Sequence, residues 1–195
     1  GVEFPRIARM FKEYLAAGGG FVEANAGHGE RVSVMRTIPH LDALADTPHV
    51  EVLDHEKAGE LLERAEGVIA GTCSCRHEKL HLGEKRCDVP LAACLSFGTE
   101  ASFQVRRGLG RTIGKQEARE LLAMAKEQRL VLNADNVRKD AGFICLCCSC
   151  CCNVLGSIRR FGLPNLLVTS RFIAELDSSR CNGCGACAAA CPIEA

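Results

Sequence analysis

Apolar residues recur at three- and four-residue spacings in three stretches of the chain, the pattern of helices with one buried face. The first stretch stops before Gly18, and its apolar face consists of Phe4, Ile7, Ala8, Phe11, Tyr14 and Leu15. Asp54 is placed to cap the second helix, and Gly114 precedes the third. The spacing therefore predicts amphipathic helices over residues 4–15, 55–66 and 115–128.

Short β-branched or apolar runs lie between these helices and predict strands. They cover residues 31–38, 50–53, 68–70, 130–132, 166–168 and 172–176, and residues 153–161 predict one or two turns of helix. The pattern favours an α+β fold, a mixed domain of short strands and about three amphipathic helices. The turn-rich residues 162–165 place a domain boundary near residue 163, between a domain at 1–163 and a smaller unit at 164–195.

The charge balance gives no reason to expect a polyanionic partner. The 195 residues contain 24 Lys plus Arg and 24 Asp plus Glu, a formal net charge of zero. This disfavours nucleic-acid binding. No apolar run reaches the roughly 18 residues of a membrane helix, so we expect a cytoplasmic protein without membrane insertion. The chain begins at Gly1 and stops soon after a cysteine motif, and we expect its termini to be truncated.

Cysteine dominates the candidate chemistry, with 14 residues beside no Trp and one Tyr. A secreted disulfide scaffold would be shorter and would carry a secretory segment. Residues 145–152 hold six of the cysteines, a crowding that pairwise disulfide geometry would hardly satisfy. Metal-bound thiolates in a reducing compartment are the favoured interpretation.

The C-terminal motif is Cys181-x2-Cys184-x2-Cys187-x3-Cys191-Pro192. With Gly183 and Gly185 between its cysteines, this segment resembles the bacterial-type ferredoxins, which bind [4Fe-4S] clusters. The resemblance implies a ferredoxin-like half module in which three thiolates hold one cluster and the fourth ligates another. A two-cluster ferredoxin carries a second such motif downstream, and this chain does not. A four-thiolate zinc site is the alternative.

The same spacing occurs inside the crowded run, in Cys145, Cys148 and Cys151. Our hypothesis is that these three hold a cluster with Cys191 as fourth ligand, and that Cys152 completes the cluster of Cys181, Cys184 and Cys187. Cys147 and Cys150 are not assigned to either cluster by this hypothesis. Three roles are open for them: ligands in a shifted register of the motif, thiols beside the ligands, or buried apolar residues.

A third group comprises Cys73, Cys75, Cys87 and Cys94, whose spacing matches no short motif. Four thiols suffice for one cube, and free or redox-regulatory thiols are the alternative. All 14 cysteines are thus candidate metal ligands. The succession of Cys-x-Cys-Arg, Cys-Asp-x-Pro, the crowded run and the C-terminal motif resembles multi-cluster iron–sulfur proteins of anaerobic bacteria and archaea. That resemblance implies electron transfer as an accessory to a redox enzyme.

Two other patterns carry less weight. Residues 77–81 fit the H-E-x-x-H pattern of zinc peptidases, but no third ligand follows and the segment shows no sustained helical face. Residues 106–111 are basic and glycine-rich but lack the ending of a phosphate-binding loop, so a solvated turn is favoured.

These patterns favour a non-catalytic protein or subunit that relays single electrons through two to three [4Fe-4S] clusters. Cubes held by four thiolates have no open coordination position, which suits outer-sphere transfer. Arg76 and Arg180, beside candidate ligands, are expected to raise cluster potentials. The expected partner is a flavoprotein or a metal-dependent oxidoreductase, within a larger complex. An iron–sulfur enzyme with an open cluster site, a cluster-based redox sensor and a zinc-binding protein remain alternatives.

Overall fold

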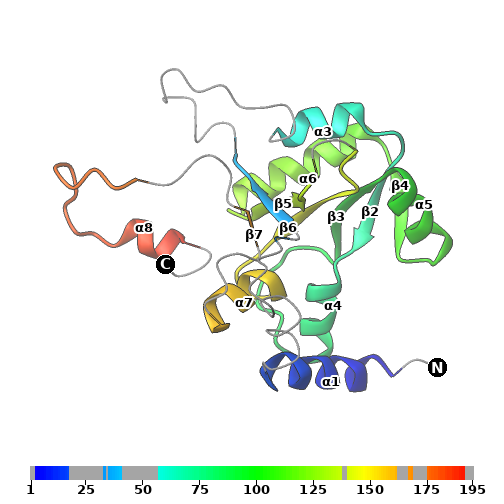
Figure 1. The fold of residues 1–195 in the computed structure, drawn as a ribbon, viewed down its shortest axis with the longest axis horizontal. Helices are drawn as coiled ribbons and strands as arrows, with labels where there is room; N and C mark the ends of the chain where they lie inside the picture. The colour runs from blue at the N-terminus through cyan, green and yellow to red at the C-terminus, as the bar shows by residue number, and fades with distance from the viewer. Residues whose placement is uncertain are drawn as a thin grey trace.

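A twisted sheet forms the centre of the molecule, with helices on both of its sides (Figure 1). The computed structural model describes residues 3–17, 33, 35–40, 57–137, 140–161, 167–168 and 175–191. The strand order is β4-β2-β3-β6-β5-β1-β7. Every neighbouring pair is antiparallel except β1 and β7, which are parallel. The fold is α+β, as the sequence predicts.

Helices and strands alternate along the described chain, except that strand β5 is followed by strand β6. The helices of the described residues are α1 (Phe4–Ala17), α3 (Ala58–Arg64), α4 (Ser74–His81), α5 (Gly98–Arg106), α6 (Lys115–Glu127), α7 (Asn153–Phe161) and α8 (Ala186–Ala190). The strands are β1 (Met35–Ile38), β2 (Val68–Thr72), β3 (Ala92–Phe97), β4 (Gly110–Ile113), β5 (Val131–Asp135), β6 (Phe143–Cys147) and β7 (Leu167–Val168).

The two faces of the sheet bury different groups, as β6 shows. Its Ile144 and Leu146 belong to the larger apolar core, which includes Leu62 of α3 and residues of α6. Cys145 and Cys147 join a smaller core with Leu155 of α7. Successive strand residues point to opposite faces, so this alternation separates apolar residues from thiols. Figure 1 shows α3 and α6 on one side of the sheet and α4 and α7 on the other.

The helix predictions over residues 4–15, 115–128 and 153–161 are confirmed by α1, α6 and α7. The helix over 55–66 corresponds to α3, which begins later, at Ala58. The strand predictions over 68–70, 130–132 and 166–168 correspond to β2, β5 and β7, and β1 covers the end of the predicted strand 31–38. The predictions for 50–53, for Asp54 and for the boundary at 162–165 lie outside the described residues, as do residues 172–174 of the last strand. Glu175 and Leu176 are not in a strand.

Six of the described elements go beyond the sequence prediction: α4, α5, α8, β3, β4 and β6. The lack of a sustained helical face in residues 74–81 was misleading, because that segment forms α4. Residues 110–111, expected in a solvated turn, begin the edge strand β4. In the part of the chain that the structure describes, no helix combines the length and apolarity needed to cross a membrane.

Candidate metal centres

A transverse row of residues crosses one face of the sheet and brings two distant cysteines together. Gly71 of β2 pairs with Cys94 of β3, and the β3–β6 register continues to place Cys94 opposite Cys145. Cys145 pairs with Asn133 of β5, which pairs with Thr37 of β1. Directly paired residues project from the same face of a sheet. The row therefore places thiols from residues 94 and 145 side by side.

Four more cysteines complete a closed ring on this face. Each thiol of the ring interacts with two neighbours, in the order Cys73, Cys94, Cys145, Cys147, Cys152, Cys75 and back to Cys73. Cys73 and Cys75 stand at the start of α4, and Cys152 immediately precedes α7. We call this group the cysteine ring. Its members line a cavity of about 300 Å³.

Two buried donors beside the ring have no acceptor among the described residues. Arg76, which also lines the cavity, is 1% exposed, and its Nε lacks a hydrogen-bond partner. Asn133 is completely buried, and its Nδ2 is likewise unpartnered although its Oδ1 accepts a hydrogen bond from Thr37. The Asn133 side chain lies beside the Cys147 thiol. Buried donors without acceptors are costly, and an anionic group among these thiols would satisfy both. The ring therefore fits an iron–sulfur cluster.

Proton sharing divides the thiols of the ring. Hydrogen bonds from Cys75 and Cys94 hold the pKa of the Cys73 thiol far below its ordinary value. Hydrogen bonding to Cys152 and Cys73 raises the pKa of Cys75 far above it. Burial disfavours the Arg76 cation, but the charges of Cys73 and Cys94 outweigh this and raise its pKa. Arg76 therefore stays charged and favours thiolate formation nearby.

A second group is much tighter than the ring. Cys87, Cys148, Cys150 and Cys151, the Cys87 set, have Sγ atoms that all lie within 4.8 Å of one another. The Sγ of Cys87 is 3.6 Å from that of Cys148 and 4.0 Å from that of Cys151, and the Sγ atoms of Cys150 and Cys151 are 3.4 Å apart. Three of these thiols come from the β6–α7 turn, and Cys87 comes from the segment between α4 and β3.

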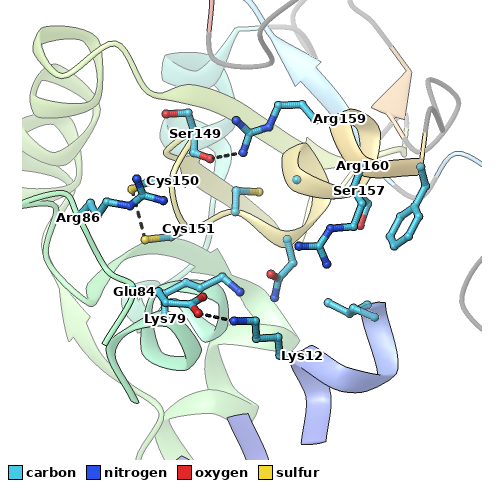
Figure 2. A pocket seen from close by; sticks show the side chains of 15 residues that line it. Lys12, Lys79, Glu84, Arg86, Ser149, Cys150, Cys151, Ser157, Arg159 and Arg160 are labelled. Carbon is cyan, nitrogen blue, oxygen red and sulfur yellow. Dashed lines mark hydrogen bonds and ion pairs between the residues drawn. The ribbon is translucent and has the colours of Figure 1, made fainter. Parts of the chain in front are cut away.

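A basic cavity of about 590 Å³ opens beside the Cys87 set. Figure 2 shows Cys150 and Cys151 on one wall, close to Arg86. The cations that line the cavity are Lys12, Lys79, Arg86, Arg159 and Arg160, against the single carboxylate of Glu84, which pairs with Lys12. This surplus of positive charge suits a neighbouring centre whose four thiolates carry net negative charge.

The terminal motif has the local geometry of a thiolate-binding loop. Gly183 and Gly185 have φ of +73° and +72°, in the left-handed region that glycine enters most readily. The Gly183 N–H donates to the Sγ of Cys181, with 3.4 Å between N and Sγ. Residues 175–190 are exposed, and α8 begins directly after Gly185. These dihedral angles let the backbone wrap closely around the thiols.

Residues 174–195 match the family model of the 4Fe-4S binding domain. This segment of the chain is similar to 4Fe-4S binding domains. It contains Cys181, Cys184, Cys187 and Cys191. Together with the cysteine groups beside the sheet, the match supports iron–sulfur binding. Neither a curated protein nor a solved structure matches the chain.

The structure groups the remaining cysteines differently from the sequence hypothesis. Cys145 belongs to the ring, whereas Cys148 and Cys151 belong to the Cys87 set. Cys87 is separate from Cys73, Cys75 and Cys94, with which the sequence hypothesis grouped it. Cys147 and Cys150, left over by spacing, take places in the ring and in the Cys87 set. Cys152, assigned to the terminal cluster, contacts Cys75 and Cys147. The physical reason is strand alternation, which places Cys145 and Cys147 on one face, whereas Cys148 lies beyond the end of β6.

Sequence reasoning missed Asn133, for which no local signal exists, because only strand pairing brings it to the thiols. The H-E-x-x-H segment forms part of α4, with the Nε2 atoms of His77 and His81 3.2 Å apart and Phe4 packed against both rings. Glu78 is buried, and its carboxylate accepts hydrogen bonds from Lys79 and Asn153. The Glu78 carboxylate therefore links α4 to α7. This does not fit the role of a peptidase glutamate, which activates water.

Proposed function

We propose that the protein relays single electrons through iron–sulfur clusters to or from a partner oxidoreductase. The observation that carries the proposal is the combination of a 4Fe-4S binding domain with a ring of thiols in the sheet domain. Clusters held only by thiolates exchange electrons without an open coordination position. The organisation proposed is a mixed domain at 1–163 and a ferredoxin-like module at 164–195, with β7 of the second unit joining the sheet of the first.

The terminal cluster would be held by Cys181, Cys184 and Cys187, with Cys191 as the fourth thiolate. The positive φ of the intervening glycines and the N–H···S bond to Cys181 support this assignment. Hydrogen bonds to cluster sulfurs stabilise the reduced state and so raise the potential. Exposure of the module would place this cluster at the surface, where a partner can approach.

The second cluster would occupy the cysteine ring. Its thiols surround a cavity instead of converging on a point, which suits a polynuclear centre. The unpartnered Arg76 Nε and Asn133 Nδ2 would donate to cluster sulfur. Four thiols of the ring suffice for a cube. Binding of the cluster by the ring thiols would release the protons that these thiols still hold.

The partner is proposed to be a flavoprotein or a metal-dependent oxidoreductase within a larger complex. The neutral net charge gives no long-range attraction to a polyanion and is compatible with specific docking to a protein surface. Relay through two centres requires one to receive and the other to deliver electrons.

The first experiment measures iron, acid-labile sulfide and the electron paramagnetic resonance spectrum of the anaerobically purified full chain. We expect equal iron and sulfide, with two one-electron signals after reduction by dithionite. The variants C184S and C94S should each remove one signal, while S178A, an exposed neighbour of the terminal motif, should keep both. Iron-free protein, or clusters that dithionite cannot reduce and a mild oxidant cannot reoxidise, would contradict the relay.

A further inference from the structure

We propose that Cys87, Cys148, Cys150 and Cys151 bind one tetrahedral metal ion, zinc or iron, and not an iron–sulfur cube. This inference is independent of the proposed electron relay, which rests on the terminal motif and the ring. It assigns a distinct chemistry to four of the cysteines that the sequence interprets as cluster ligands.

The separation of the sulfur atoms carries the proposal. A metal–sulfur bond of about 2.3 Å places two corners of a tetrahedron about 3.8 Å apart. The Sγ separations of 3.4, 3.6 and 4.0 Å in the Cys87 set lie close to this value. Thiolates on a cube bind four separate irons, so their sulfurs stand farther apart than ligands of one ion. A tetrahedral arrangement of four thiolates is typical of zinc or iron.

The ring provides an internal comparison within the same chain. Among the described residues, the Cys87 set is the group of three or more ligand residues whose ligand atoms all lie within 4.8 Å. The ring thiols surround a cavity and satisfy no such condition. The two neighbouring groups therefore differ in the way expected of a cluster site and a single-ion site.

Backbone N–H groups beside the sulfurs also fit a site that holds thiolates. The N–H of Cys151 acts to lower the pKa of the Cys148 thiol, and the N–H of Arg86 acts in the same way on the Cys150 thiol. The Arg76 guanidinium also reaches Cys148. Donors of this kind orient thiolate ligands and offset their charge. The turn is closed by the Cys152 N–H, which donates to the Cys148 carbonyl oxygen with an N···O distance of 3.1 Å.

The charge around the site agrees with this assignment. Four thiolates and a divalent ion give a net charge of −2, and binding releases the thiol protons. Arg76 and the cations of the basic cavity supply compensating positive charge. The ion would fasten the segment that carries Cys87 to the β6–α7 turn. This link would hold α4 and α7, which supply three ring thiols at or beside their first residues, in fixed relative positions.

The test compares zinc, iron and acid-labile sulfide in the full chain and in the variants C87S and C150S. We expect each variant to lose one metal ion per chain with no loss of sulfide. The matched control is C184S in the terminal motif, which should lose about four iron together with about four sulfide. A loss of about four iron and four sulfide in C87S would overturn the proposal. Failure of the electron relay would appear instead in the ring and terminal variants.

A measurement on the unmodified protein removes any dependence on the folding of the variants. If the ion is zinc, X-ray absorption at the zinc edge should show four sulfurs at about 2.3 Å and no neighbouring metal. If the ion is iron, the Mössbauer spectrum should contain one iron per chain outside the clusters. Protein without zinc, in which every iron belongs to a cluster, would overturn the proposal.

Discussion

Arg76 of α4 donates a hydrogen bond to the backbone carbonyl oxygen of Leu146 on β6. Leu146 lies between Cys145 and Cys147, so this bond joins the helix that carries Cys75 to the strand that carries two further ring thiols. The same guanidinium interacts electrostatically with Cys73 and Cys94 of the ring and with Cys148 of the Cys87 set. A buried cation thus connects two groups of thiols.

Replacing Arg76 by Gln should lower the midpoint potential of the ring cluster. The substitution removes a buried positive charge that stabilises the reduced, more negative cluster. A redox titration followed by electron paramagnetic resonance measures the effect, and the exposed terminal cluster serves as internal control. An unchanged ring potential, or an equal shift of both clusters, would argue against a direct role of Arg76.

Replacing Asn133 by Leu should also lower the ring potential, without loss of iron. Leu has a similar size but offers no N–H to the group beside Cys147. The same titration, with iron counted in parallel, tests this. Loss of iron would instead show that Asn133 is needed for the structure of the ring and not for its potential.

In the metal-free protein, Cys73 should be alkylated at pH 6 well before Cys75. The pKa of Cys73 is lowered, so it is already a thiolate at this pH, whereas the pKa of Cys75 is raised and it remains a thiol. The two residues are similarly half-buried, which makes Cys75 a matched control. Peptide mass spectrometry after brief iodoacetamide treatment gives the order, and equal labelling would contradict the proposed proton sharing.

Replacing Gly110 by Ala should destabilise the fold by about 1–3 kcal/mol. A Cβ at this position would lie 2.6 Å from the Cδ1 of Ile69, and 3.0 and 3.1 Å from backbone atoms of Ala70 and Gly71. The backbone contacts on β2 cannot move aside as a flexible side chain could.

Gly59 supplies the contrast to Gly110. It is exposed within α3 and has no atom within 4 Å of an added Cβ. Gly59→Ala should therefore stabilise the protein by about 0.5–1 kcal/mol, because alanine restricts the unfolded chain. Chemical denaturation of both variants measures the difference. Equal effects at the two positions would refute the packing argument.

The sequence by itself determined the helices with a clear apolar face and the chemistry of the terminal motif. The apolar spacing of α1 and α6 is local, and so is the spacing of Cys181, Cys184 and Cys187, because each depends on residues a few positions apart. Cysteine content alone likewise indicated metal binding. These features need no knowledge of which strands pair.

The grouping of the other cysteines was decided by tertiary structure. Cys94 and Cys145 are 51 positions apart and meet only because β3 pairs with β6. Cys87 reaches Cys148 because the segment after α4 returns to the β6–α7 turn. Spacing that resembles a ferredoxin motif in residues 145–151 was therefore misleading, since strand alternation and the end of β6 send neighbouring thiols to different sites.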